Sequence, residues 1–204
     1  MSIYFTSDTH FGHSNILIFC NRPWLQEGDV EHDETGRLRF VHKDIADLRV
    51  REMDEGLIAK WNAKVSPQDT VYHLGDICFY RKEEQIRGIL DRLNGKICLI
   101  RGNHDNEVLD IYPERFEWVR SIHTVKHDKK RIECCHYPMI SWNQRERGAY
   151  HLYGHCHGTL PEDPEAYSFD IGADVNNLEP VSVEQVFERM EKKSKNVKLS
   201  TRGR

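Results

Sequence analysis

The stretch that decides the fold is residues 3–10, IYFTSDTH, an apolar run that ends in a carboxylate and an imidazole. Its first four residues are typical of a buried strand, and Asp8 and His10 follow it closely. Four later stretches repeat this design, because each has an apolar run, then glycine or small residues, and then carboxylate, amide or imidazole groups. They are residues 74–76 (LGD), 101–105 (RGNHD), 135–138 (CHYP) and 153–157 (YGHCH).

These five polar clusters stand where predicted strands end. Ligands bind to open α/β sheets just beyond the carboxyl ends of the strands. We therefore expect the clusters to converge on one rim, where they supply carboxylates, one amide and several imidazoles. Such a set suits Mn, Fe, Zn or Ni better than a pure oxygen cage would, and it lacks the thiolates of structural zinc. The sequence thus predicts a metal site at this rim.

Two of the clusters hold potential ligands at alternate positions, Asp8 with His10 and His155 with His157. Alternate residues of an extended segment point to the same side, so we expect each pair to face the site. The set contains more ligands than one ion needs, which indicates two ions. Two ions about 3.5–4 Å apart share a bridging carboxylate, and Asp76 is the candidate.

Composition argues against several other classes of protein. The 204 residues include 29 Lys and Arg and 33 Asp and Glu, and the net charge of −4 does not indicate a general nucleic-acid binder. The longest apolar run, residues 16–20, is far shorter than the ~18 residues of a membrane span. Residues 1–20 lack the pattern of a secretory signal, and the cysteine spacing is not a disulfide framework. We therefore expect a cytoplasmic location and reduced thiols.

The apolar pattern predicts a single domain over residues 1–191, with a layered α/β fold and mixed sheets. A surface insertion is expected around residues 26–47, either as a substrate lid or as a solvated elaboration, and a basic, flexible tail at residues 192–204. His73, inside a strand, is expected to be a hydrogen-bonded core histidine. Ser182 with Gln185 predicts a capping box. Strands are expected at residues 3–6, 70–74, 97–100, 118–125, 131–135 and 151–153, and helices over residues 15–20, 53–61, 86–93 and 183–190.

In content, order and rough spacing, the five clusters resemble the signature of the calcineurin-like metallophosphoesterases, from residue 8 to residue 157. The sequence is most similar to the small, stand-alone bacterial and phage members, which begin like residues 8–13 (DTHFGH). Residues 136–139 with Trp142, and residues 174–177 before residues 180–182, also resemble that group. The resemblance implies a two-sheet sandwich flanked by helices, a four-layer αββα fold.

The resemblance also implies a role for each matching position. The implied ligands are Asp8, His10 and His157 for the first metal, Asn103, His136 and His155 for the second, and Asp76 as the bridge. The implied catalytic residues are His104, which would contact the phosphate and protonate the leaving oxygen, and Asp105, which would orient the His104 ring. Three further residues are candidate substrate contacts, with structural packing as the alternative for each: His13, Arg22 and Trp142.

From the residues and this resemblance we expect a hydrolase of phosphodiesters, phosphomonoesters or both, in which a metal-bridging hydroxide attacks phosphorus in line. The expected cofactors are two divalent metal ions, Mn first and Fe, Zn or Ni as alternatives. A metal-dependent DNA or RNA endonuclease with the same site is the second hypothesis, which the basic tail favours and the net charge does not. A non-catalytic binding scaffold is the third, and the complete ligand set argues against it. The expected partner is a phosphate ester, nucleotides and nucleic acids included, with no membrane and no obligate protein partner.

Overall fold

The computed structural model describes residues 1–194, and its larger sheet has five strands in the order β11-β1-β4-β5-β6. β1, β4, β5 and β6 run parallel, and β11 pairs with β1 in the antiparallel direction at one edge. The carboxyl ends of β1, β4 and β5 therefore lie at the same edge of this sheet. The strands are β1 (Ile3–Thr6), β4 (Thr70–His73), β5 (Lys96–Ile100), β6 (Phe116–Arg120) and β11 (Val181–Ser182).

The second sheet has four strands in the order β10-β9-β8-β7. β8, β9 and β10 are parallel, whereas β7 and β8 form an antiparallel hairpin. The two sheets lie against each other, and their inner faces share one apolar cluster that includes Phe5, Ile100 and Leu152. The strands are β7 (Ile122–His127), β8 (Lys130–Cys135), β9 (Tyr150–Tyr153) and β10 (Ser168–Asp170). This arrangement confirms the predicted α/β fold with mixed sheets.

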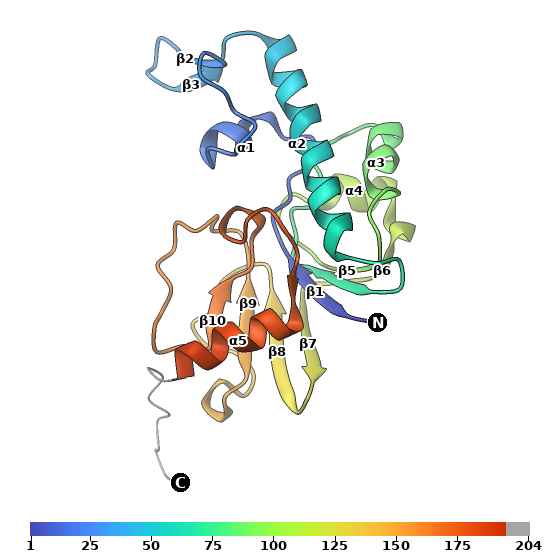
Figure 1. The fold of residues 1–204 in the computed structure, drawn as a ribbon, viewed down its shortest axis with the longest axis vertical. Helices are drawn as coiled ribbons and strands as arrows, with labels where there is room; N and C mark the ends of the chain where they lie inside the picture. Colours follow the sequence, from blue (N-terminus) through green and yellow to red (C-terminus); the bar gives the residue numbers. More distant parts are fainter. Residues whose placement is uncertain (195–204) are drawn as a thin grey trace.

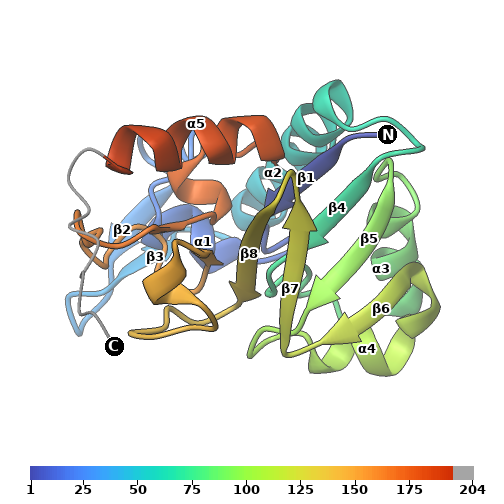
Figure 2. The same ribbon diagram turned by 90° about the horizontal axis from the view of Figure 1, so that it is seen from below.

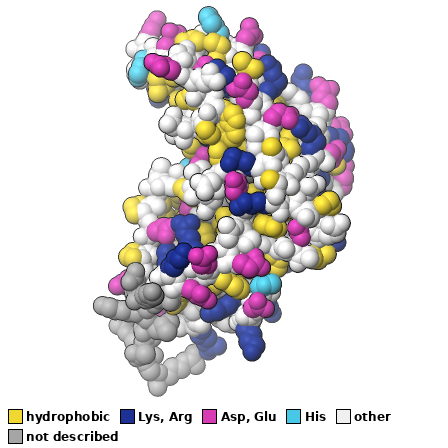
Figure 3. All heavy atoms as spheres, in the orientation of Figure 1, with side chains coloured by type: hydrophobic (Ala, Val, Ile, Leu, Met, Phe, Trp, Pro, Cys, Tyr) yellow, Lys and Arg dark blue, Asp and Glu magenta, His cyan; other side chains and the backbone are white. Residues whose placement is uncertain are grey.

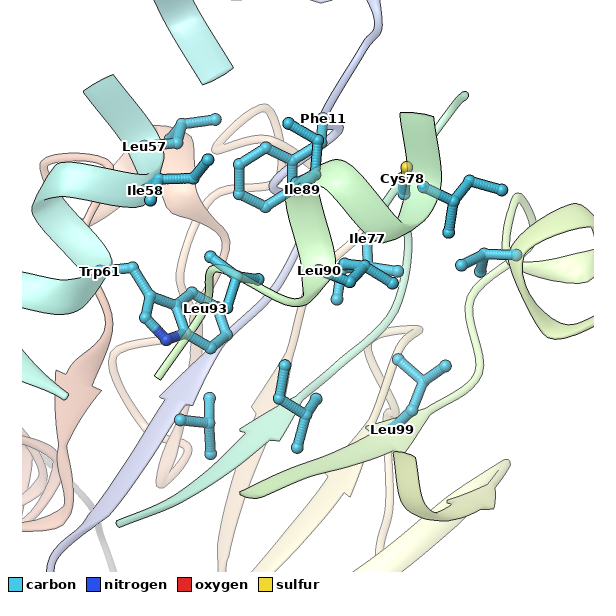
Figure 4. Packing of buried hydrophobic residues seen from close by; sticks show 14 of the residues in the cluster. Phe11, Leu57, Ile58, Trp61, Ile77, Cys78, Ile89, Leu90, Leu93 and Leu99 are labelled. Atoms are coloured by element: carbon cyan, nitrogen blue, oxygen red, sulfur yellow. The ribbon is translucent and has the colours of Figure 1, made fainter. Parts of the chain in front are cut away.

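Helices cover the face of the larger sheet that points away from the second sheet (Figures 1 and 2). They are α2 (Lys43–Lys64), α3 (Glu83–Leu90) and α4 (Asn106–Ile111), followed by the short η1 (Pro113–Arg115). Their apolar side chains form a second core with the outer residues of the sheet, and this core includes Trp61, Leu90 and Leu99 (Figure 4). α5 (Val183–Ser194) instead packs Val186 and Met190 into the core between the sheets.

The predicted strand over residues 118–125 is wrong, because two strands occupy this stretch. β6 ends at Arg120 in the larger sheet, and β7 begins at Ile122 in the second sheet. The chain changes sheet at Ser121. The more buried side chains are Phe116 and Trp118 in β6 but His123 and Val125 in β7, so the alternation shifts by one position at Ser121. No glycine or proline marks the break in the sequence.

The expected insertion is partly regular structure. It contains the two-stranded hairpin of β2 (Val30–His32) and β3 (Leu38–Phe40), and α2 begins before the predicted boundary at residue 47. Together with α1 (Ser14–Phe19) the hairpin forms one end of the molecule (Figure 1). At the other end of the chain, Lys192 and Lys193 belong to α5 rather than to a tail. The rest of the predicted tail, residues 195–204, lies outside the described residues.

Two local predictions are confirmed by hydrogen bonds. The Ser182 backbone N–H donates to Gln185 Oε1 at 2.9 Å and the Gln185 N–H donates to Ser182 Oγ at 3.3 Å, which is a reciprocal capping box at the start of α5. His73 is fully buried, with its Nε2 3.0 Å from Thr9 Oγ1, and its Nδ1 accepts the Gly75 N–H at 3.2 Å. Burial lowers the pKa of His73 to about 3, so it is a neutral core histidine.

Candidate metal centre

Backbone hydrogen bonds hold the loops after β1 and β4 side by side. The Asp8 N–H donates to the Gly75 carbonyl at 2.9 Å, and the His10 N–H donates to the Asp76 carbonyl at 3.1 Å. The parallel pairing of the two strands therefore continues past their ends, as a further bridge between Phe11 and Cys78 shows. This continuation brings Asp8, His10 and Asp76 together, as we predicted from their positions after neighbouring strands.

Contacts between the two sheets bring the remaining clusters to the same place. His136 follows β8, and its Nδ1–H donates to the Leu74 carbonyl of the larger sheet at 2.6 Å. His155 follows β9, and its backbone N–H donates to Asp8 Oδ2 at 2.9 Å. The strand ends of the two sheets thus meet at one rim.

The site residues do not sit on extended backbone, which corrects our reasoning about their spacing. Asp8 has a φ of 56°, His10 54°, Asp76 57°, His155 69° and His157 47°. These values lie in the left-handed region, which side chains other than glycine rarely adopt and which costs of order 1–3 kcal/mol per residue. The alternate residues still face one space, but tight turns rather than an extended strand put them there.

Two glycines are required where these turns approach each other. A Cβ at Gly102 would overlap the Asp76 carboxylate, and a Cβ at Gly154 would overlap Ser7 and the Asp8 carboxylate. Any larger residue would push a carboxylate out of the site. The glycines of the RGNHD and YGHCH stretches are therefore part of the site's geometry.

The first group of potential ligands consists of Asp8, His10 and His157. Asp8 Oδ1 lies 3.6 Å from His10 Nε2 and 3.8 Å from His157 Nε2. Asp8 and His10 are buried, and the exposed fraction of the His157 side chain is 20%. Burial would raise the pKa of Asp8, but the nearby His10 ring and the charges of three imidazoles hold it below the usual value. Asp8 is thus a carboxylate near neutral pH.

The second group is arranged around His136, whose Nε2 lies 3.7 Å from Asp76 Oδ2 and 3.1 Å from Asn103 Oδ1. The His155 ring lies edge-on to it, with 5.2 Å between the ring centroids. His136 is fully buried, whereas Asn103 and His155 are exposed. Asp76 Oδ2 is also 3.8 Å from His10 Nε2, so this carboxylate lies between the two groups, a position compatible with the predicted bridge.

The donor atoms of the first group fit a divalent metal ion. Asp8 Oδ1 and His10 Nε2 are buried and have no hydrogen-bond partner among the described residues. A buried polar atom without a partner costs about 1–3 kcal/mol, so a ligand that satisfies both atoms is favoured here. Because an anionic oxygen and an imidazole nitrogen lie 3.6 Å apart, that ligand is a cation. His136 fits as well, because its Nδ1–H donates to Leu74 and leaves the Nε2 lone pair free.

The surroundings of His157 also favour positive charge. Its Nδ1 lies 2.7 Å from Asp174 Oδ2 and 3.5 Å from Cys20 Sγ. Burial by itself would lower the pKa of His157, but the hydrogen bonds to Asp174 and Cys20 and the charge of Asp8 raise it to about 10. We gave Asp174 and Cys20 no role from the sequence, although Asp174 lies in one of the stretches that carry the resemblance.

Arg22 is one of the three predicted substrate contacts, and the structure corrects this prediction. Its guanidinium is buried and donates to the Asp174 carboxylate and to the backbone carbonyls of Asp8 and Thr9. These donors face protein groups and not the cavity of the site. The second predicted contact, Trp142, packs in a separate small cluster and donates its indole N–H to the Ala149 carbonyl. It does not line the cavity either.

His13, the third predicted contact, does line the cavity and also supports a ligand. Its Nδ1 lies 3.2 Å from His10 Nδ1, and its ring stacks on Phe79 with 4.1 Å between centroids. Burial lowers the pKa of His13 to about 4, to which the nearby imidazoles and Arg22 add. A neutral His13 accepts the His10 Nδ1–H, which directs His10 Nε2 toward Asp8. Phe79 also contacts His10 and His104, and no motif in the sequence singled it out.

Asp105 does not orient the His104 ring, in contrast to the role implied by the resemblance. Its Oδ1 accepts the Ile77 N–H at 2.9 Å, and its Oδ2 accepts the N–H groups of Asp76 and Gly102 at 3.0 and 2.7 Å. Asp105 is fully buried, and burial raises its pKa even though these bonds oppose the shift. It ties the Gly102 turn to the Asp76 turn, so it positions backbone rather than an imidazole.

A cavity of about 440 Å³ opens beside both ligand groups, between α1 and the segment after β9. Figure 3 shows that the molecule is hollowed on one side, between the part that carries α1 and the part that carries β9 and β10. The exposed His104 faces this cavity, and its backbone N–H donates to Asp76 Oδ1 at 2.8 Å. The residues along the cavity include His10, His13, Phe19, His104, His155 and His157.

Comparison with known proteins agrees with the sequence motifs. Residues 1–187 match the family model described as calcineurin-like phosphoesterase. The chain is 30% identical over 196 residues to the uncharacterized protein MJ1445 of Methanocaldococcus jannaschii, covering 93% of this chain and 92% of that protein. It is 24% identical over 185 residues to the gene 66 protein of Mycobacterium phage L5, covering 77% and 78% of the two chains.

One solved structure supports the fold. It is the protein of unknown function AQ665 from Aquifex aeolicus, with a TM-score of 0.61 and 22% sequence identity. The likeness covers 92% of this chain and 98% of that chain. Within residues 1–194, no helix is both long and apolar enough to cross a membrane.

Proposed function

This chain belongs to the calcineurin-like phosphoesterase family, a family of phosphoric ester hydrolases, and on that premise we propose that it hydrolyses phosphodiesters or phosphomonoesters at a site for two divalent metal ions. The observation that carries the proposal is that potential ligand atoms of both groups converge on two neighbouring carboxylates. One ligand atom of Asp8 lies within 4.8 Å of those of His10 and His157, and one lies within 4.8 Å of those of Asp76 and His136. Asp76 Oδ2 lies 3.8 Å from His10 Nε2 and 3.7 Å from His136 Nε2, between the two groups.

The donor set supports the choice of metal. It consists of carboxylate oxygens, an amide oxygen and imidazole nitrogens, which suits Mn first, with Fe, Zn or Ni as alternatives. We propose that Asp8, His10 and His157 would hold one ion, that Asn103, His136 and His155 would hold the other, and that Asp76 would help to hold both. When bound, the two ions would polarise the phosphoryl group and neutralise the charge that develops on it.

The residues of the chain supply the other requirements of the reaction. His104 faces the cavity and lies beside Asp76 through its backbone N–H, so it is placed to give a proton to the departing oxygen. The hydrogen bonds of Asp105 hold the turn that carries His104 against the turn that carries Asp76. Phe79 packs against the His104 ring, with 4.7 Å between centroids, and limits its movement.

The test is a metal-dependent activity screen on the purified chain. Protein stripped with a chelator is reloaded with Mn²⁺ and assayed on aryl monoesters, linear diesters, 2′,3′-cyclic nucleotides and circular single-stranded DNA. We expect Mn²⁺-dependent hydrolysis of at least one ester. In Asp76→Ala we expect the rate of hydrolysis to fall about 10³-fold and the bound metal to be lost. Undiminished turnover in Asp76→Ala would refute the proposal. Cleavage of the DNA circles would identify an endonuclease, and intact circles would count against one.

A His104→Gln variant forms a second arm of the same screen. If His104 protonates the leaving oxygen, the variant loses about 10²–10⁴-fold in kcat/KM on esters with an alkyl leaving group. It loses little on nitrophenyl esters, whose leaving group departs without a proton. Equal losses on both kinds of ester would contradict this role for His104.

A further inference from the structure

Arg22 is a buried cation that contacts the turn at Asp8 and also Asp174, which lies beside His157. Its exposed fraction is 2%, and its Nη1–H and Nη2–H groups donate to the carbonyls of Thr9 and Asp8 at 2.8 and 2.9 Å. The same guanidinium donates through Nε and Nη2 to the two oxygens of Asp174, at 2.7 and 3.0 Å. The planar fork of arginine suits such a double contact, which lysine could not make.

Asp174 also contacts His157. It lies in η3 (Ala173–Val175), after β10, and its Oδ2 is 2.7 Å from His157 Nδ1. A hydrogen bond from Nδ1–H to this carboxylate fixes the tautomer in which Nε2 carries the lone pair, and Nε2 is the atom that lies 3.8 Å from Asp8 Oδ1. One chain of contacts therefore links the Asp8 backbone, Arg22, Asp174 and the His157 ring.

A second ion pair of the same geometry lies away from the ligand groups and provides a comparison for the Arg22–Asp174 pair. Arg49 and Asp29 form the same two-fold contact, with Nε and Nη2 donating to the two carboxylate oxygens at 2.7 and 3.1 Å. Both side chains are largely buried, at 11% and 7% exposure. Neither residue of this second pair belongs to the ligand groups or lines the cavity.

We propose that Arg22 and Asp174 are positioning residues that hold Asp8 and His157 at the separation the first metal ion needs, and that they thereby set the affinity of the Asp8–His10–His157 group. Arg22 fixes the left-handed turn at Asp8 through two carbonyls, and Asp174 fixes the direction of the His157 ring. Neither Arg22 nor Asp174 contacts the Asn103–His136–His155 group, so changes at these two residues should leave the metal affinity of that group unchanged. This inference rests on the proposed metal site, but its test measures metal binding and not hydrolysis.

The experiment compares Asp174→Asn with the matched variant Asp29→Asn. Both remove one carboxylate charge from a largely buried arginine pair and keep the shape of the side chain. Mn²⁺ binding to the chelator-stripped proteins is titrated by calorimetry, and folding is followed by circular dichroism. We expect Asp174→Asn to bind one of two Mn²⁺ equivalents about 10–100-fold more weakly, with the other equivalent unchanged. Asp29→Asn should bind both equivalents as the unaltered protein does.

Each other outcome has a definite meaning. If Asp174→Asn binds both equivalents with unaltered affinity, or if Asp29→Asn weakens them equally, the positioning role is wrong. If Asp174→Asn does not fold, Arg22→Lys is titrated in its place, since it keeps the charge and loses the fork, and the same weakening of one equivalent is expected. If the unaltered protein binds no Mn²⁺ at all, the proposed function fails, whereas binding and hydrolysis without the Asp174 effect overturn only this inference.

Discussion

The two ligand groups of the metal centre differ in how firmly the fold holds them. In the first group Asp8 and His10 are buried, His13 contacts the rear of His10, and Asp174 contacts the rear of His157. In the second group His136 is buried, but Asn103 and His155 are exposed. The Tyr137 hydroxyl reaches Asn103 Oδ1 only at 3.4 Å. One half of the site is thus largely buried and contacted from behind by neighbouring residues, and the other half borders the solvent.

The difference between the two groups bears on how tightly each should bind its metal ion. A ligand group that is already ordered loses little conformational entropy on binding, so the first group should bind its ion more tightly. Both groups border the cavity, through His10 and His157 of the first group and His155 of the second. The exposed side chains of the second group can adjust to a substrate there. We therefore expect unequal affinities for the two ions.

The largest effect on metal affinity is expected when one histidine is removed from each group in turn. His157→Gln should weaken the tighter Mn²⁺ equivalent by more than about 100-fold, because it removes a direct ligand from the ordered group. His155→Gln should weaken only the looser equivalent. Calorimetric titration of the two variants and of the unaltered protein measures this directly. If both variants lose the same equivalent, the two groups do not act as separate halves.

A smaller effect is expected from the residues behind the ligands. His13→Phe keeps the stacking on Phe79 but removes the acceptor for His10 Nδ1–H, and should weaken the tighter equivalent about 10-fold. Tyr137→Phe removes a long hydrogen bond to Asn103 and should change the looser equivalent by less than about 3-fold. The same titration provides the measurement. A larger effect of Tyr137→Phe would reverse the comparison.

A separate effect, on the stability of the fold rather than on metal binding, concerns Asp54 of α2, which holds the turn behind His10. Its oxygens accept the Gly12 N–H at 3.0 Å and the Tyr80 hydroxyl at 2.8 Å. Burial raises the pKa of Asp54 to about 6, above its ordinary value of 3.8. The folded chain therefore binds this proton more tightly than the unfolded chain does, and the stabilisation is complete below about pH 4 and lost as the pH rises through 6.

Urea unfolding of the metal-free protein at pH 4 and pH 8 measures this contribution. Asp54→Asn cannot titrate, so its stability relative to the unaltered protein should improve by about 3 kcal/mol between the two pH values. Asp29→Asn serves as the control with the opposite sign, because the hydrogen bond from Arg49 lowers the pKa of Asp29. An equal pH response of the two variants would contradict the raised pKa of Asp54.

The sequence predicted the strands that end in the site, because an apolar run and its polar end are local features. It did not predict that residues 118–125 divide between two sheets, since no glycine or proline marks the break at Ser121. Nor did it predict that Asp105 and His104 have different partners. Neighbours in sequence need not be partners in space, and the turn directs the Asp105 carboxylate toward backbone N–H groups on both loops.

By itself the sequence determined which chemistry is available: five clusters of oxygen and nitrogen donors, each fixed after a strand by a pattern a few residues long. Only the tertiary structure decided which donors are held by supporting contacts and which are exposed to solvent. Arg22 and Asp174 are 152 positions apart, and their contact exists because the loop after α1 and the loop after β10 close over the same rim. Such a contact depends on how both sheets pack together, and no local pattern records it.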